Sequence, residues 1–328
     1  MLRIGLNPYG LTYHLGLQGL GTPRANPAAA GLEGFITLAT ELESQTLELW
    51  DGWLAPMSAG ELTALRARLE ALHMLPVIST GLQHADIDAC IRAAEALGAS
   101  LIRMALTPVL CGDRYAFGAR WYELVAGVWE RLAAFAARAR EHGLTLVIEN
   151  HQDFTSGELV NFCVETGPNV GIVFDTGNTF PVGEAPLDFT RIIAPHVRYV
   201  HLKDYRVQFT PDGYRLVRCA IGDGAVPFGE LLEILAAHHD VLPAVLEPGA
   251  LDVRHVRLLT ADWWKGYPPR EAEALAACLL AAQRHRLPDD ADYRTPWERG
   301  ADGEIARYEL DMIRRSAANM RALGLWGN

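Results

Sequence analysis

The chain has 328 residues, half of them hydrophobic, and a formal net charge of −11. This composition permits a large core without disulfides, and a (β/α) barrel of about 250 residues with insertions is a single domain of this size. The negative charge argues against a nucleic-acid groove, because binding a polyanion needs a local excess of lysine and arginine. No apolar run approaches the roughly 20 residues that span a bilayer, so we expect neither a nucleic-acid nor a membrane partner.

The cysteines and the first residues bear on location. Five cysteines are an odd number and contain no CxxC pair, which indicates reduced thiols. The chain begins MLRIGLN, which is typical of a first strand and carries no signal segment. We therefore expect a cytoplasmic protein.

Apolar runs and helical repeats alternate along the first half of the chain. Strands are predicted at 2–6, 46–50, 76–80 and 101–106, and helices at 31–43, 58–73, 86–97 and 120–142. Ser58 and Glu61 form a capping box, and Gly98 and Gly143 follow the ends of two helices. A long loop over 7–27 follows the first strand and exceeds what a simple connection requires.

The second half continues the alternation. Strands end at Glu149, Asp175, His201 and Glu247, and helices are predicted at 156–165, 187–193 and 228–239. The loop 205–227 contains a small hairpin, and two further helices cover 270–285 and 302–323. Eight strands alternating with helices predict an α/β fold, a (β/α)8 TIM barrel. We expect the barrel to occupy residues 1–268 and a C-terminal helical extension, packed on it, to occupy 269–328.

Four strands of the second half each end on one ionisable residue: LTLVIENH on Glu149, NVGIVFDTGN on Asp175, HVRYVHLKD on His201 and LPAVLEPG on Glu247. Their cores are continuously apolar, which is typical of strands buried on both faces. A charge at the end of such a strand is costly unless it is paired or bound to a cation. Four in succession predict a metal site.

The spacing of these four residues along the chain predicts that their side chains converge. The intervals from Glu149 to Asp175 and from Asp175 to His201 are both 26 residues, and the next, to Glu247, is 46. A βα unit needs roughly 30 residues, so the third interval is one unit with an enlarged loop. Parallel strands present their C-terminal ends on one side, and the four side chains are expected at one mouth of the barrel.

Three carboxylates and one imidazole make a hard, oxygen-rich site. Such a site favours Mn²⁺ or Mg²⁺, with Co²⁺ or Zn²⁺ as alternatives, over a structural zinc site. A cation there holds a keto-sugar and stabilises the enediolate formed when a proton leaves carbon. Reprotonation gives an isomer or epimer, loss of a β-leaving group gives a dehydratase, and an enolate formed by loss of CO₂ gives a decarboxylase. The ligands alone do not separate these outcomes.

Further residues near the strand ends are candidate substrate contacts, each with an alternative structural role as a packing or surface residue. Cationic side chains suit a carboxylate or phosphate, and tryptophans can line a sugar ring. The candidates are Trp50, Arg103, His151, Asn178, Lys203 and Arg206, with Trp53, Arg254, Arg257, Trp263 and Trp264 as further possibilities.

The series VIEN, VFDTGN, VHLKD, IGDG and LEPG resembles the xylose isomerase-like TIM barrels, which include ketose 3-epimerases, inosose dehydratases, other sugar lyases and, more distantly, the endonuclease IV group. The resemblance is strong over 144–249. It implies that Glu149, Asp175, His201 and Glu247 bind one divalent cation. It also implies that Glu149 and Glu247 flank a bound ketone and move protons.

Three departures from the family pattern matter. Asn178 stands where epimerases and the endonucleases often carry histidine, the extra ligands of a trinuclear endonuclease site are not visible, and the C-terminal extension exceeds a minimal epimerase. We expect an isomerase or epimerase of a small keto-sugar or sugar acid, and the sequence leaves both a monomer and a homo-oligomer open. The alternatives are a lyase on the same site, more remotely an endonuclease IV-like nuclease, and a non-catalytic sugar-binding barrel.

Overall fold

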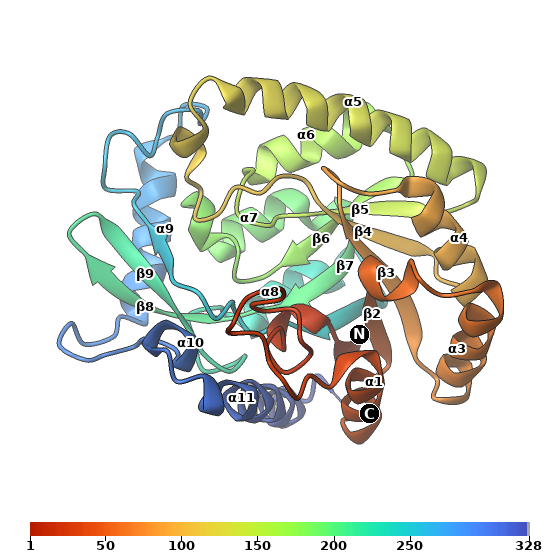
Figure 1. Cartoon of the computed structure of the whole chain (residues 1–328). Coiled ribbons are helices and arrows are strands. Elements are labelled where there is room, and N and C mark those ends of the chain that lie inside the picture. Colours follow the sequence, from red (N-terminus) through yellow and green to blue (C-terminus); the bar gives the residue numbers. More distant parts are fainter. Residues whose placement is uncertain (327–328) are drawn as a thin grey trace.

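The computed structural model describes residues 1–326, and they form a closed barrel of parallel strands surrounded by helices (Figure 1). Around the barrel the strand order is β1, β10, β7, β6, β5, β4, β3, β2. The strands are β1 (Leu2–Leu6), β2 (Thr46–Trp50), β3 (Leu75–Gly81), β4 (Leu101–Ala105), β5 (Thr145–Glu149), β6 (Val170–Asp175), β7 (Val197–Leu202) and β10 (Leu242–Leu246). The predicted (β/α)8 TIM barrel is confirmed.

Helices connect successive strands on the outside of the barrel (Figure 1). They are α1 (Gly31–Glu41), α2 (Asp51–Leu54), α3 (Ala59–Ala71), α4 (Ile87–Leu97), α5 (Arg120–Glu141), α6 (Ser156–Thr166), α7 (Pro186–Ile193) and α8 (Phe228–Ala236). The capping box of Ser58 and Glu61 forms at the start of α3, and Gly98 ends α4 with a φ of 71°. These local signals set helix boundaries close to those expected.

The predicted hairpin is present and extends into a second sheet. Strands β8 (Tyr205–Thr210) and β9 (Gly213–Arg218) pair antiparallel, and β11 (Arg254–Val256) joins β9. The chain ends in α9 (Ala272–Arg284), α10 (Pro296–Arg299) and α11 (Asp302–Ala322). This confirms a helical C-terminal part, with α10 and α11 lying below the hairpin in Figure 1. No helix in the described part of the chain is long and apolar enough to cross a bilayer.

The barrel interior has two layers of different chemistry, because alternate residues of each strand point inward. The lower layer is an apolar plug of fully buried side chains: Val77, Val147, Val173, Tyr199 and Val245. Two residues further along the same strands lies a polar layer: Ser79, Glu149, Asp175, His201 and Glu247. The strand period therefore places the polar residues together at the C-terminal mouth of the barrel, while the outward residues pack against the helices.

Candidate active site

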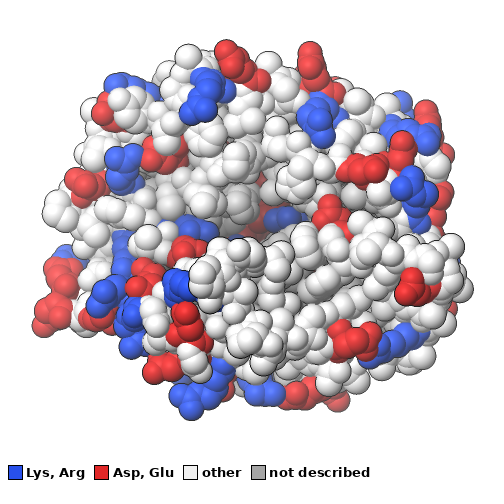
Figure 2. Space-filling model, in the orientation of Figure 1, with Lys and Arg blue, Asp and Glu red and all other residues white. Residues whose placement is uncertain are grey.

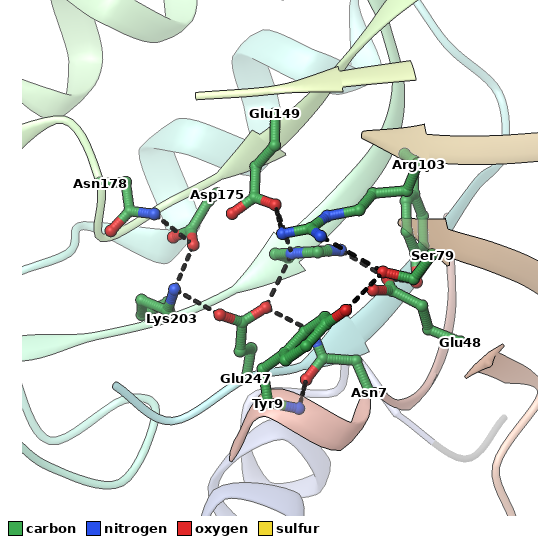
Figure 3. A network of polar contacts seen from close by, with 12 residues as sticks. Asn7, Tyr9, Glu48, Ser79, Arg103, Glu149, Asp175, Asn178, Lys203 and Glu247 are labelled. Carbon is green, nitrogen blue, oxygen red and sulfur yellow. Dashed lines mark hydrogen bonds and ion pairs between the residues drawn. The ribbon is translucent and has the colours of Figure 1, made fainter. Parts of the chain in front are cut away.

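The four predicted ligands converge. Glu149, Asp175, His201 and Glu247 each offer one ligand atom, and these atoms lie within 4.8 Å of one another. Three of the four side chains are fully buried, and that of Glu247 is 8% exposed. Figure 3 shows Glu149 and Glu247 pointing toward one another from opposite sides of the centre, with Asp175 beside them. The four groups lie close enough to hold one small cation at the mouth of the barrel.

Glu48 fixes the orientation of His201. Its Nε2 donates to Glu48 Oε2 over 2.7 Å, and the hydroxyl of Tyr199 donates to the same oxygen over 2.8 Å. A carboxylate that accepts from Nε2–H leaves the lone pair of a neutral imidazole on Nδ1. Nδ1 is turned toward Glu149 and Glu247, where a ligand atom is required.

Unsatisfied polar atoms mark the centre. Oε1 of Glu149 and Nδ1 of His201 are buried and have no hydrogen-bond partner among the described residues, although Nδ1 lies 2.8 Å from Glu247 Oε2. Buried polar atoms are nearly always satisfied, so such a pair indicates a ligand that completes the site. A divalent cation coordinated by oxygens and one nitrogen fits these donors.

The balance of charges at the centre also fits a divalent cation. Four buried carboxylates, those of Glu48, Glu149, Asp175 and Glu247, face two permanent cations. Arg103 pairs with Glu149, and Lys203 Nζ pairs with Asp175 and, at 2.5 Å, with Glu247. With His201 neutral, two negative charges remain, which a divalent cation neutralises.

The pKa directions follow from these contacts. Burial alone would lower the pKa of His201, but the Glu48 and Glu247 carboxylates outweigh burial and raise it to about 10. Burial would raise the pKa of Glu247, but Lys203 and His201 hold it well below its usual range. Burial raises the pKa of Asp175 to about 7, and Lys203 offsets only part of that effect. Because a cation requires a neutral imidazole, metal binding at this centre should release the proton of His201.

A hollow of about 420 Å³ opens above the centre, and most predicted substrate contacts line it. Trp50, Arg103, His151, Lys203 and Arg254 are among its lining residues. Figure 2 shows this face hollowed near the middle, with charged side chains inside. The volume suits a small sugar or sugar acid.

The two remaining predicted substrate contacts, Asn178 and Arg206, do not line this hollow. Asn178 donates from Nδ2 to Asp175 Oδ2 over 2.7 Å, so it orients a ligand of the centre. Arg206 is exposed on β8 and lines a different hollow, because the strand alternation turns Tyr205 toward the site and Arg206 away from it. We leave Arg206 out of the proposed site.

Among the further candidate substrate contacts, two tryptophans and one arginine make structural contacts instead. Trp263 is buried and its indole donates to the carbonyl of Cys111, while Trp53 packs against Phe35. Arg257 pairs with Asp113 over 2.5 Å.

Sequence reasoning missed several residues of the centre. Glu48 lies in the middle of the buried strand TLELW, and that isolated charge was the available signal. Asn7, which follows β1, donates from Nδ2 to Glu247, and Tyr9 contacts Ser79 over 3.0 Å. Both lie in a loop whose path the sequence did not predict.

Asp204 holds two sequence motifs together, VHLKD, which contains it, and IGDG, which lies in the loop after the hairpin. Its carboxylate accepts from the backbone N–H groups of Gly222, Gly224 and Val226 over 2.8 to 3.0 Å. A side chain at position 224 would collide with this carboxylate, so glycine is required there. Asp204 therefore anchors the loop after the hairpin and does not reach the centre, whereas its neighbour Lys203 does.

A closed parallel barrel with clustered carboxylates and a histidine at its C-terminal mouth defines a class of barrel enzymes. A family model described as xylose isomerase-like TIM barrel matches residues 36–250, and the chain belongs to this family.

Two relatives show local sequence similarity. The uncharacterized protein YihM of Escherichia coli K12 is 29% identical over 198 residues, which cover 60% of this chain and 58% of YihM. An inosose dehydratase of Bacillus anthracis is 32% identical over 130 residues, covering 33% of this chain and 43% of the dehydratase. The chain thus spans less than two thirds of the length of either relative.

Solved structures share the fold over nearly the whole chain. D-psicose 3-epimerase of Clostridium cellulolyticum H10, solved with D-tagatose, has a TM-score of 0.57 and 18% identity, covering 94% of this chain and 99% of that one. A xylose isomerase-like TIM barrel protein of Mycobacterium smegmatis, solved with magnesium, has a TM-score of 0.55 and 17% identity, covering 96% and 97%. At these identities the solved structures show the shared fold, and proteins similar to this chain include a sugar epimerase and inosose dehydratases.

Proposed function

We propose that this protein is a metal-dependent enzyme that moves protons at carbon on a small keto-sugar or sugar acid, with isomerisation or epimerisation as its reaction. The observation that carries this proposal is the convergence of Glu149, Asp175, His201 and Glu247 within 4.8 Å beneath a substrate-sized hollow. The unsatisfied atoms and the excess negative charge at the centre support a divalent cation, for which Mn²⁺ or Mg²⁺ is preferred over Co²⁺ or Zn²⁺.

Glu149 and Glu247 are the proposed proton-transfer residues. They face one another across the centre from β5 and β10 (Figure 3). Glu247 is held ionised by Lys203 and His201, so it suits the removal of a proton from the carbon beside the carbonyl. Return of that proton at the neighbouring carbon gives an isomer, and delivery by the opposite glutamate inverts the first carbon. A divalent cation held by Glu149, Asp175, His201 and Glu247 would supply the positive charge that offsets the negative charge left when the proton is removed.

The surrounding cations favour an acidic substrate. Arg103 and Lys203 lie at the floor of the hollow and Arg254 at its wall. A guanidinium pairs well with a carboxylate, so Arg103 and Arg254 would orient such a group without taking part in proton transfer.

A dehydratase reaction is the second candidate. The sequence similarity to inosose dehydratases, 32% over 130 residues, favours it. On the same site, the ionised Glu247 would remove the proton at carbon, and Lys203, whose ammonium lies 2.5 Å from Glu247, would protonate the departing hydroxyl.

The first experiment measures metal content of the purified protein by mass spectrometry, in the parent and in Asp175→Ala and His201→Ala. We expect about one Mn, Mg, Co or Zn per chain in the parent and none in the two variants. Glu184→Gln changes a partly buried glutamate that is hydrogen-bonded to Ser156 outside the hollow, and this control variant should keep the metal. A parent that takes up no metal even with added Mn²⁺ would contradict the proposal and leave a sugar-binding barrel.

Product mass then separates the reactions. Keto-sugars and sugar acids are incubated with the metal-loaded protein, and the products are weighed by mass spectrometry. An unchanged mass with a changed configuration supports the isomerase or epimerase, and the loss of one water supports the dehydratase. The loss of CO₂ would overturn both in favour of a decarboxylase.

A further inference from the structure

A second hollow, of about 660 Å³, lies between the end of the β8–β9 hairpin and α11. Four arginines line it, Arg206, Arg218, Arg294 and Arg315, together with Tyr293 and Tyr308. In Figure 1 the hairpin and α11 lie on the same side of the molecule. The hollow shares no lining residue with the catalytic one, so it is a separate feature of the surface.

The charges in this hollow are not balanced. Arg315 pairs with Asp223 over 2.6 Å, and Arg294 pairs with Asp292 over 2.8 Å. Within residues 1–326, Arg206 and Arg218 have no carboxylate within ion-pair distance. Asp311, the other acid of the lining, pairs with no arginine in that part of the chain. A chain with a net charge of −11 thus keeps a locally basic hollow.

Arg218 is the most informative of these residues. It is only 6% exposed, and its Nη2 donates to the carbonyl of Gly10 over 2.6 Å. Its Nε and Nη1 have no hydrogen-bond partner in the described chain. A guanidinium cannot lose its charge, and a buried charged donor without a partner costs more than a neutral one.

The nearby glutamate does not satisfy this arginine. Glu309 on α11 is buried, but its carboxylate accepts from the backbone N–H groups of Tyr13 and His14 over 3.1 and 2.7 Å. It therefore fastens the loop after β1 to α11. Arg218 contributes to the field around Glu309 without forming an ion pair with it.

We propose that this hollow is a second binding site for a small anion that bears phosphate or carboxylate groups. The free guanidinium of Arg206 at the rim and the buried one of Arg218 at the wall supply the charge, and a planar fork of donors suits either type of oxyanion. Tyr308, whose ring lies 5.5 Å from the Arg218 guanidinium, borders the same space.

The site has a physical link to the catalytic centre. Gly10, which accepts from Arg218, ends the short helix Pro8–Gly10 that also carries Tyr9. Tyr9 contacts Ser79 and lies beneath the Arg103 guanidinium at 5.0 Å. An anion that draws Arg218 into the hollow acts on a segment that borders the catalytic hollow.

The test is calorimetric titration of the whole protein with inorganic phosphate and, separately, with citrate, at constant ionic strength. For at least one of the two probes we expect saturable binding that depends on Arg206 and not on Arg254, and the preferred probe distinguishes phosphate from carboxylate recognition. Arg206→Gln should weaken binding by about tenfold, the effect of losing one charge-assisted hydrogen bond. Arg218→Gln should weaken it further, and because Arg218 is buried its fold is checked by circular dichroism.

Two controls make the result decisive. Arg92→Gln removes an exposed arginine of α4 and should leave binding unchanged. Arg254→Gln removes a cation from the wall of the catalytic hollow and should also leave it unchanged. Binding that survives Arg206→Gln, or that is lost in Arg254→Gln, would place the anion elsewhere and overturn the proposal. The absence of saturable heat with both probes up to about 10 mM would overturn it as well.

Discussion

The apolar plug and the polar layer of this barrel are built from the same strands, only two residues apart. The plug consists of Val77, Val147, Val173, Tyr199 and Val245, and it buries side chains that need no partner. The polar layer buries the charged groups of Glu149, Asp175, His201 and Glu247 beside their partners Glu48 and Arg103, and the desolvation of these groups is only partly offset by mutual pairing. The lower layer therefore contributes packing, whereas the upper layer keeps buried charges at a cost in stability, which is the pattern expected of the proposed site.

The largest effect should come from the polar layer. Glu247→Gln keeps the size of the side chain but removes the proposed base. We expect turnover on an identified substrate to fall by about 10²- to 10⁴-fold, with an unchanged circular dichroism spectrum. Glu184→Gln, outside the hollow, should keep the parent rate. Parent-like turnover in Glu247→Gln would refute the assignment of Glu247.

The next largest effect is expected at Glu48, which contacts His201 of the polar layer and Tyr199 of the plug. Glu48→Gln disturbs the hydrogen bond that fixes the tautomer of His201, and we expect divalent-metal affinity to fall by about 10- to 100-fold. Tyr199→Phe removes the other donor to the same Glu48 oxygen and should change metal affinity by less than about threefold. Chelator competition measures both. Equal losses in the two variants would mean that Glu48 acts through packing instead of through His201.

A substitution in the apolar plug should lower stability and leave metal affinity unchanged. Val173→Ala leaves a small cavity beneath the polar layer and should lower the free energy of unfolding by on the order of 2 kcal/mol. Metal affinity should remain at the parent value. Urea denaturation and metal titration of the same variant give both quantities, with Val164→Ala, 62% exposed on α6, as control. A loss confined to metal affinity would show that the two layers are not separable.

The smallest effect concerns a buried carboxylate away from the centre. Burial raises the pKa of Asp153 to about 7, because its partners are the hydroxyl of Thr107 and the N–H of Phe154 instead of a paired cation. A folded pKa above the unfolded value of 3.8 means that the folded state holds the proton more tightly, so stability falls as pH rises from about 4 to about 7.

Asp153→Asn removes this dependence. Relative to the parent, the variant should gain on the order of 1 kcal/mol between pH 6 and pH 7, measured by urea denaturation at both values. A constant difference between the two proteins would show that the Asp153 carboxyl titrates normally. Glu247 contrasts with it, since an equally buried carboxylate beside Lys203 and His201 has its pKa lowered.

Much of the fold followed from local patterns. Continuous apolar runs identified the barrel strands, and capping signals such as Ser58 and Gly98 set helix boundaries, because these features depend on neighbouring residues alone. The hairpin after His201 was also predicted. By contrast, β11 and α10 were not, because β11 is a three-residue strand that forms only by pairing with β9 and α10 is a four-residue helix.

The residues of the candidate site likewise include some that the local sequence predicts and others that only long-range contacts bring together. Glu149, Asp175, His201 and Glu247 were predictable because each ends a buried strand, and parallel strands must end on one side of a closed barrel. Local sequence pattern was therefore enough to predict this convergence. Long-range packing sets the other contacts: Glu48 orients His201, Arg206 faces away from the hollow, Arg218 is buried with no carboxylate partner in the described chain, and Glu309 fastens the loop after β1. Those contacts join residues far apart in the chain, and no local pattern records which of them meet.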